Sequence, residues 1–191
     1  RLGTWFGSKE LAGGGSLLDI GVHLLDLVLY ILDNFEPVAV SGATHSKFGS
    51  RGLGEGGWGL SDRENIPFDV DDFATALIKL KGGVTVSLDV SWALHQRDSN
   101  AMNVNLFGTE AGATVYPAEV YAYGANKGEY QLLQNPAAAS QYEHSSRFFN
   151  FINTILGEEQ LCVTIEQALA VQSIIDAIYQ SSQSGKEVRF D

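Results

Sequence analysis

The feature that most constrains the fold is a pair of long segments, residues 73–81 and 84–94, joined by Gly82-Gly83. Two adjacent glycines accept the positive φ angles of a tight hairpin turn, so the segments are expected to pair as antiparallel strands. In the second segment, apolar residues alternate with small or polar ones; the apolar ones are Val84, Val86, Leu88, Val90, Trp92 and Leu94. This alternation predicts a sheet with one buried face and one polar face.

Other short strands and three helices are expected around this hairpin. The strands fall at residues 38–48, 103–107, 113–116, 120–123, 130–133 and 188–190. Helical spacing of apolar residues marks the segments 17–33, 148–156 and 164–185. Ser16 is the predicted N-cap of the first helix. The pattern predicts an α+β fold, a largely antiparallel open sheet covered on one face by helices, with residues 1–191 forming a single domain.

Composition limits the classes of partner. The chain has 191 residues, 45% of them hydrophobic, which is enough to build a core, and its formal net charge is −11. That charge repels phosphate backbones and anionic lipid, so we expect no nucleic-acid partner and no membrane association. The most apolar stretch, residues 17–32, is too short and too charged to span a bilayer.

Cysteine and methionine usage bear on the compartment and on completeness. The one cysteine, Cys162, cannot form a disulfide within the chain, which favours a reducing compartment, the cytoplasm. Its apolar neighbours Leu161 and Val163 predict a buried, structural thiol. Because the chain opens on Arg1 and its only methionine is Met102, we expect it to be part of a longer protein.

The first helix carries the best candidates for chemistry. Its polar residues share one stripe; they are Asp19, His23, Asp26, Tyr30 and Asp33. Asp19 and His23 are four residues apart, so in an α-helix their side chains would meet, and the carboxylate would favour the imidazolium. Such a pair can exchange a proton at neutral pH. The spacing is equally compatible with an aspartate that satisfies N-terminal amides beside an ordinary surface histidine.

Three other patterns in the sequence have features of ligand sites. Asp19, His23 and Asp26 could form a metal site, but without a second histidine nearby we expect no metal. Residues 54–59 match the dinucleotide pattern G-x-G-x-x-G, yet neither a strand before them nor a helix after them is predicted, so we expect no cofactor site in this chain. The glycines at 13–15 could hold an anion, although a flexible helix entry explains them equally well.

The run Gly13-Gly14-Gly15-Ser16-Leu17-Leu18-Asp19-Ile20-Gly21-Val22-His23-Leu24-Leu25-Asp26 resembles the G-G-G-x-L-x-D-x-G-x-H-x-x-D signature of the Gfo/Idh/MocA family of NAD(P)-dependent oxidoreductases. The resemblance continues through Asp71-Asp72, Ser91-Trp92 and Gly108-Thr109-Glu110 to the last helix, and so covers essentially the whole chain. It implies the C-terminal, substrate-binding domain of an enzyme whose N-terminal Rossmann domain, with the NAD or NADP site, is not present here.

The resemblance also implies roles for individual residues. Asp19 would orient the substrate and His23 would transfer the proton, while Trp5 or residues 49–69 would line the substrate pocket. The substrate would be a sugar, inositol or related polyol, and this chain alone would be inactive. The open sheet face would form a homo-oligomer, a dimer or tetramer. The alternative is a non-catalytic sugar-binding or assembly module with the same sheet.

Overall fold

The structure is a computed structural model that describes residues 4–53, 68–97, 101–124, 129–134 and 146–190. Its contacts divide the chain into two compact units, one formed by Arg1–Arg97 with Ile165–Asp191 and the other by Asp98–Thr164. The sequence predicts one domain over this length, and each of the two units is described by itself below. The glycine pattern at residues 54–59 lies outside the described residues.

The first unit contains the predicted hairpin and most of the core. Its helical elements are η1 (Trp5–Gly7), α1 (Lys9–Ala12), η2 (Leu17–Gly21), α2 (Val22–Leu32), η3 (Gly49–Arg51), η4 (Lys81–Gly83) and α4 (Ile165–Ser184). Its strands are β1 (Pro37–His45), β2 (Phe73–Leu80), β3 (Thr85–Ser91) and β8 (Val188–Arg189). They form one antiparallel sheet in the order β3-β2-β1-β8.

The hairpin between β2 and β3 forms as the two glycines predict. Gly82 has φ 78° and Gly83 has φ 83°, and Leu80 N donates to Val84 O at 2.8 Å to close the turn. The second strand ends at Ser91, earlier than the alternation suggests. There the backbone N–H of Trp92 donates to Asp72 O at 2.9 Å, so the chain leaves the sheet beside the start of β2.

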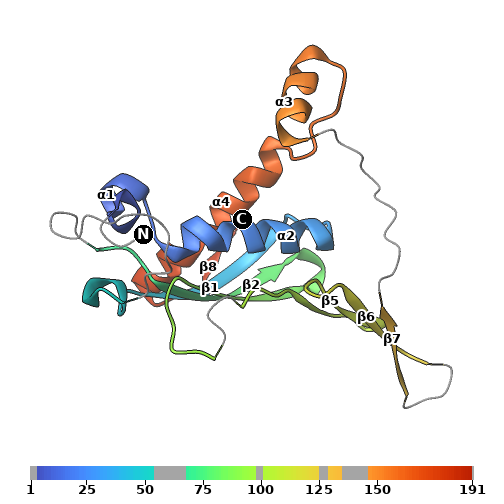
Figure 1. Ribbon diagram of the computed structural model, residues 1–191, viewed down its shortest axis with the longest axis horizontal. Coiled ribbons are helices and arrows are strands. Elements are labelled where there is room, and N and C mark those ends of the chain that lie inside the picture. The colour runs from blue at the N-terminus through green and yellow to red at the C-terminus, as the bar shows by residue number, and fades with distance from the viewer. Residues whose placement is uncertain (1–3, 54–67, 98–100, 125–128, 135–145, 191) are drawn as a thin grey trace. The chain divides into compact units, whose positions relative to one another are not determined.

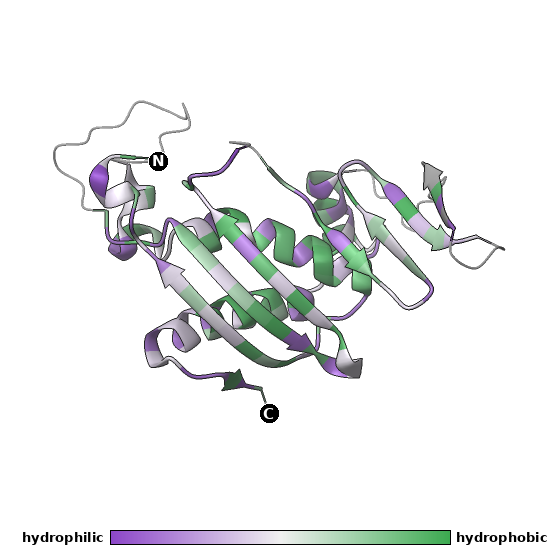
Figure 2. Cartoon of the chain, turned by 90° about the horizontal axis from the view of Figure 1, so that it is seen from below, coloured by the Kyte–Doolittle hydropathy of each residue, from purple (hydrophilic) through white to green (hydrophobic). Residues whose placement is uncertain are grey.

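Helices cover one face of this sheet, which confirms the predicted α+β arrangement for the first unit. Figure 1 shows α2 and α4 on the same side of β1 and β2. The fully buried core side chains come from these helices and from the strands; they include Leu17, Leu25, Leu29, Val40, Ile78, Ile174, Ile175 and Ile178. The opposite face, seen from below in Figure 2, carries small and polar residues such as Ser41, Thr75, Ser87 and Asp89, together with the apolar Phe73 and Leu77 of β2.

By length and composition alone, the apolar stretch Lys9–Leu32 is long and apolar enough to cross a membrane. In the structure, Gly13 interrupts this stretch at φ 81°, between α1 and η2. Leu17, Leu25 and Leu29 then lie fully buried in the core. Part of the apolar stretch is thus buried between helix and sheet, while Leu11 and Ile31 remain exposed.

The described residues of the second unit form a β-sheet and a helix. The strands β4 (Asn105–Phe107), β5 (Ala111–Thr114), β6 (Glu119–Tyr123) and β7 (Tyr130–Gln134) pair in that order, all antiparallel. The sequence predicts a single open sheet, which is wrong for the residues that the structure describes, because their strands form two four-stranded sheets. Local alternation and turns identify each strand, but they carry no information on which strands share a ladder.

The helix of the second unit, α3 (Arg147–Leu156), holds the segment that follows it. Ser146 caps the helix by accepting from Phe149 N at 3.2 Å, and Gly157 ends it at φ 76°. The side chain of Asn150 is buried; its Nδ2 donates to Gln160 O at 2.7 Å, and its Oδ1 accepts from Cys162 N at 3.0 Å. The Cys162 side chain is exposed, so the buried thiol expected from its apolar neighbours is wrong.

Candidate functional site around Asp19

The start of the helix that carries Asp19 is held by the buried carboxylate of Asp71. Its Oδ1 accepts from Gly15 N at 2.8 Å and from the Tyr179 hydroxyl at 2.7 Å. Its Oδ2 accepts from Ser16 Oγ and Leu17 N, both at 2.9 Å. Asp71 is only 6% exposed, so these charge-assisted bonds lie inside the protein, where they are strong.

This arrangement corrects two expectations about the glycine-rich entry. Ser16 does not cap the helix; its hydroxyl donates to Asp71, and the carboxylate satisfies the N-terminal amides. The anion at this helix start is therefore a side chain of the protein itself. Gly15 is required by close approach, because a Cβ at this position would lie 1.9 Å from Asp71 O.

Tyr179 connects the same carboxylate to α4. Burial, and then the negative charge of Asp71, raise the pKa of Tyr179 far above its usual 10.0. The hydroxyl therefore stays protonated and keeps donating to Asp71 across the neutral range.

This raised pKa predicts a pH-dependent stability. The unfolded chain releases the Tyr179 proton near pH 10.0, whereas the folded chain retains it. The contribution of this hydroxyl to the free energy of unfolding is therefore complete below pH 10.0 and is lost as the pH rises further. We expect the difference in unfolding free energy between wild type and Tyr179→Phe to shrink above pH 10.0 in urea titrations. A difference that stays constant from about pH 8 to about pH 11 would contradict the assignment.

Asp19 lies on a π-helical turn, η2, which precedes α2. Gly21, in the same turn, packs against β3: a Cβ there would lie 3.1 Å from Leu17 Cδ1 and 3.2 Å from Val90 Cγ1. The glycine thus lets the turn approach the sheet. Single π-turns inside helices are rare and are frequent at functional sites.

The half-buried carboxylate of Asp19 has a partner that its helical spacing did not suggest. Trp92 Nε1 donates to Asp19 Oδ2 at 2.9 Å, across 73 positions of sequence. The His23 side chain is exposed and makes no hydrogen bond or ion pair with any residue that the structure describes. The expected pairing of Asp19 with His23 is therefore absent here, because a π-turn between them changes the α-helical spacing on which it rested.

Trp5 belongs to the same unit, in the short turn η1. Its ring is 51% exposed and stacks on Phe6 with a centroid distance of 4.0 Å. Gly7 O, at the end of this turn, accepts from Asp69 N at 3.0 Å, which links the turn to the residues preceding β2. An exposed, stacked indole is suited to contact a ligand.

A second buried carboxylate, Asp72, lies next to Asp71 in the sequence. It is 1% exposed, and its Oδ2 accepts from the backbone N–H groups of Lys47, Phe48 and Gly49 at 2.8, 2.6 and 2.9 Å. The sequence contains the signal for these positions, two adjacent acids before an apolar strand, but it does not show which amides they accept from. Among the described residues, no group of three or more His, Cys, Asp or Glu side chains could hold a metal ion.

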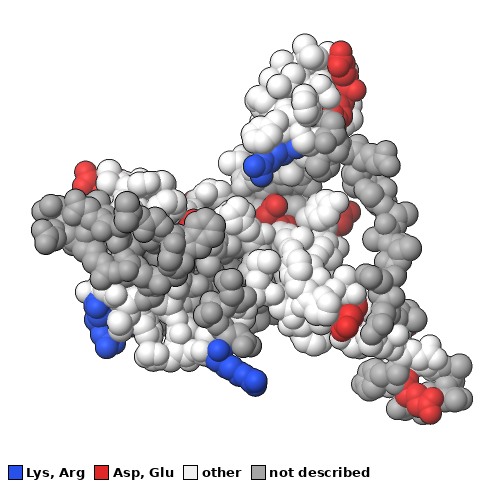
Figure 3. Space-filling view, in the orientation of Figure 1, with Lys and Arg blue, Asp and Glu red and all other residues white. Residues whose placement is uncertain are grey.

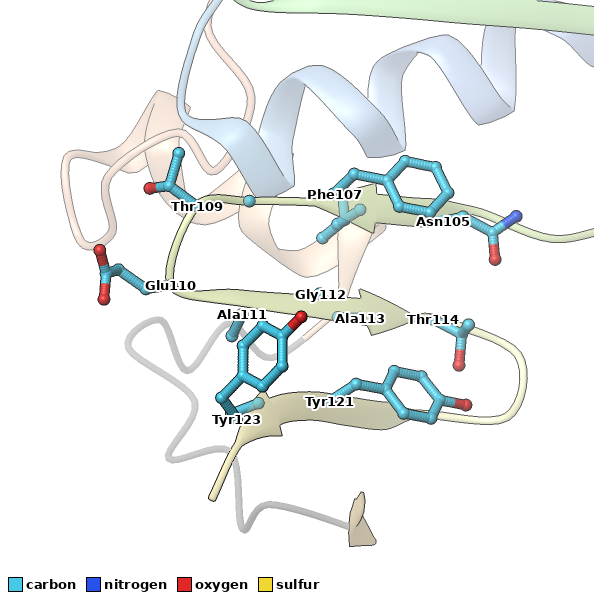
Figure 4. Close-up of a pocket in the computed structure, with 13 residues that line it drawn as sticks. Asn105, Phe107, Thr109, Glu110, Ala111, Gly112, Ala113, Thr114, Tyr121 and Tyr123 are labelled. Carbon is cyan, nitrogen blue, oxygen red and sulfur yellow. The ribbon is translucent and has the colours of Figure 1, made fainter. Parts of the chain in front are cut away.

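The second unit has a cavity of its own, of about 500 Å³, on its β-sheet. Figure 4 shows Phe107, Tyr121 and Tyr123 around it, from β4 and β6. Phe107 is 94% exposed. A hydrogen bond to Glu119 raises the pKa of Tyr121. None of the residues that the sequence singled out, Trp5, Asp19 or His23, lines this cavity.

The charges seen in Figure 3 agree with the acidic composition. On the face shown, Lys and Arg side chains occupy separate places and do not form a continuous patch.

The fold and the site define a class of protein. It is an α+β domain in which an aspartate and a histidine lie on a helix whose start is bound by a buried carboxylate, beside an open antiparallel sheet. A family model described as the GFO/IDH/MocA C-terminal domain matches residues 1–114. The chain belongs to this family.

Known relatives extend the match along the chain. D-glucoside 3-dehydrogenase of Escherichia coli (strain K12) is 33% identical over 185 residues, covering 96% of this chain and 51% of that protein. Levoglucosan dehydrogenase of Pseudarthrobacter phenanthrenivorans is 29% identical over 122 residues, covering 61% of this chain and 30% of that protein. This chain therefore spans about half the length of the first of these relatives.

Solved structures share the fold. Levoglucosan dehydrogenase in complex with NADH and levoglucosan superposes with a TM-score of 0.71 at 20% identity, covering 97% of this chain and 53% of that one. Aldose-aldose oxidoreductase from Caulobacter crescentus, complexed with glycerol, gives a TM-score of 0.71 at 21% identity and covers 100% of this chain and 52% of that one.

Proposed function

We propose that this chain is the substrate-binding domain of an NAD(P)-dependent dehydrogenase that oxidises a hydroxyl group of a glycoside, sugar or related polyol. The observation that carries the proposal is the placement of Asp19 and His23 on a helix start fixed by Asp71. The 33% identity to D-glucoside 3-dehydrogenase over 96% of the chain supports the substrate class.

In this proposal, His23 and Asp19 act on hydroxyl groups of the substrate, and Trp5 contacts its apolar face. The exposed imidazole of His23 accepts the hydroxyl proton, which is work that histidine performs near neutral pH. Asp19, held at Oδ2 by Trp92, accepts a hydrogen bond from a sugar hydroxyl and orients it. Trp5 offers an exposed ring on which the apolar face of a sugar can pack. The hydride chemistry itself is supplied by the nicotinamide.

In this proposal the nucleotide is not held by the glycine-rich helix start of this chain. The glycine-rich helix start that could take a phosphate is filled by the Asp71 carboxylate. We therefore place the NAD or NADP site in a further part of the full-length protein and derive no step through it. The proposed setting is the cytoplasm, without nucleic acid or membrane as partner, as the single cysteine and the net charge of −11 suggest.

The test compares the full-length protein with the 191-residue chain. We expect the full-length protein to reduce NAD or NADP with a glucoside or levoglucosan as donor, followed by the absorbance of reduced nicotinamide. Calorimetry should detect NAD(H) or NADP(H) binding to the full-length protein and none to the chain alone. A full-length protein that binds sugar but never reduces the nucleotide would be the non-catalytic module.

We also propose that the open face of the first sheet mediates a homo-oligomer. Its small and polar side chains suit packing of sheet against sheet about a two-fold axis. We expect Ser87→Lys with Ser91→Lys to lower the mass measured by light scattering, because like charges would meet across the interface. Gln180→Lys with Gln183→Lys, on α4, adds the same charge elsewhere and should leave the mass unchanged. An equal mass for all three proteins would place the interface elsewhere.

A further inference from the structure

We infer that Trp92 is a positioning residue for Asp19, and that the adjacent carboxylates of Asp71 and Asp72 hold the two segments between which this contact forms. The inference rests on the proposed function, since it concerns the same site. It assigns work to three residues that neither helical spacing nor composition singled out.

The contact itself is directional. An indole has a single N–H donor and no acceptor, so Trp92 can bind Asp19 only through Nε1, which it does at 2.9 Å to Oδ2. The Trp92 ring is fixed in turn by the edge contact with Phe68, at 6.2 Å between centroids. Its backbone N–H is bound to Asp72 O. A donor held from several sides limits the rotation of the carboxylate it binds.

Asp71 fixes the side of the contact that carries Asp19. Its carboxylate binds Gly15 N and Leu17 N, and its carbonyl oxygen accepts from Ser16 N at 2.9 Å. These bonds place the first residues of the π-turn, and Asp19 N continues it by donating to Gly15 O at 2.9 Å. The position of Asp19 is therefore set by a residue 52 positions further along the chain.

Asp72 fixes the opposite side. Its Oδ2 accepts from the three amides of Lys47, Phe48 and Gly49, which fixes the chain where it enters the short turn η3. Phe68 lies directly on Gly49: a Cβ there would be 2.1 Å from Phe68 Cζ, which only glycine avoids. Phe68 then meets Trp92 edge to face. Contacts thus run from Asp72 through Gly49 and Phe68 to the indole that binds Asp19.

The consequence for catalysis is a division of roles. Asp19 contacts the substrate in the proposed function, whereas Trp92 acts only through Asp19. Removing the indole N–H leaves the carboxylate in place but takes away the hydrogen bond that directs its Oδ2. If the full strength of this hydrogen bond to a charged group serves to orient Asp19, its loss lowers kcat by about tenfold to about hundredfold.

The first experiment tests the contact on the 191-residue chain, without reference to activity. In ¹H–¹⁵N spectra, the indole resonance that Trp92→Phe removes is that of Trp92. We expect Asp19→Asn to shift this resonance and to leave the Trp5 indole unmoved. A Trp92 resonance unchanged by Asp19→Asn overturns the inference, whatever the full-length protein catalyses.

The second experiment tests the role in the full-length protein. We expect Trp92→Phe to lower kcat by about tenfold to about hundredfold with an unchanged melting temperature, and Trp92→His, which keeps a ring N–H, to recover part of it. In the Asp19→Ala background, which has no side-chain acceptor for the indole, Trp92→Phe should cost nothing further, because the two act as one unit. Additive losses overturn the inference.

The two experiments fail separately from the proposed function. A full-length protein without dehydrogenase activity refutes that function, while the indole spectrum still decides whether the contact exists. Where Trp92→Phe does not fold, benzothienylalanine at position 92 keeps the shape of the ring and removes only the donor. We expect benzothienylalanine to lower kcat by the same factor as Trp92→Phe. Full activity with this isostere overturns the positioning role of Trp92.

Discussion

In the full-length protein, His23→Ala is expected to lower kcat by about 10² to 10⁴, with the affinity for NAD or NADP nearly unchanged. The imidazole is exposed and has no hydrogen-bond or ion-pair partner among the described residues. Its removal therefore eliminates a proton acceptor and changes the free energy of unfolding little. Steady-state kinetics with a glucoside donor, together with calorimetric titration of the nucleotide, would measure the two quantities.

His45→Ala is a suitable comparison for this prediction. His45 is also exposed, at the end of β1, where its ring stacks on Phe73 at 5.8 Å. His45→Ala should leave kcat within about a factor of two of wild type, because His45 has no proposed role in proton transfer. If His23→Ala turned over as fast as wild type, His23 would have no part in the mechanism.

Asp71→Ala is expected to cost about 3 to 5 kcal/mol of stability. The substitution strips acceptors from two backbone amides and two hydroxyls, those of Gly15, Leu17, Ser16 and Tyr179. These donors lie at a buried helix start where water replaces the lost acceptor poorly. Urea unfolding of the chain, followed by circular dichroism, would measure the loss.

Asp69→Ala provides the matched control for Asp71→Ala. Asp69 is exposed and accepts from Lys9 N at 2.6 Å, so its replacement should cost less than about 1 kcal/mol. Equal losses for the two variants would show that Asp71 is not the principal anchor of the helix start.

Several elements of the fold follow from local pattern. The hairpin was predictable because Gly82-Gly83 supplies positive φ angles where two alternating segments meet. The helix α3 and its end at Gly157 were predictable for the same kind of reason, since apolar spacing and a left-handed glycine act within a few residues. The antiparallel character of the sheet and its polar open face also followed from alternation, which records the two faces of a strand.

The candidate site was only partly predictable. The identity of Asp19 and His23 as candidates came from one stripe of a helix and from the resemblance of residues 13–26 to a family signature. The spacing gave the wrong partner for Asp19, because the rule assumes regular α-helix and a π-turn lies between the two residues. A change of helix type is decided by how the turn packs on β3, which a local pattern does not contain.

What the sequence by itself determined were the features that neighbouring residues decide: alternation, turns, helix spacing and net charge. What only the tertiary structure decided were the partners of buried polar groups: Asp71 with Gly15 and Leu17, and Trp92 with Asp19. The exposure of Cys162 belongs to the same group, because local apolarity does not show whether a segment reaches the core. The physical reason is that a buried carboxylate must find donors, and chain topology alone determines which distant amides and indoles lie within reach.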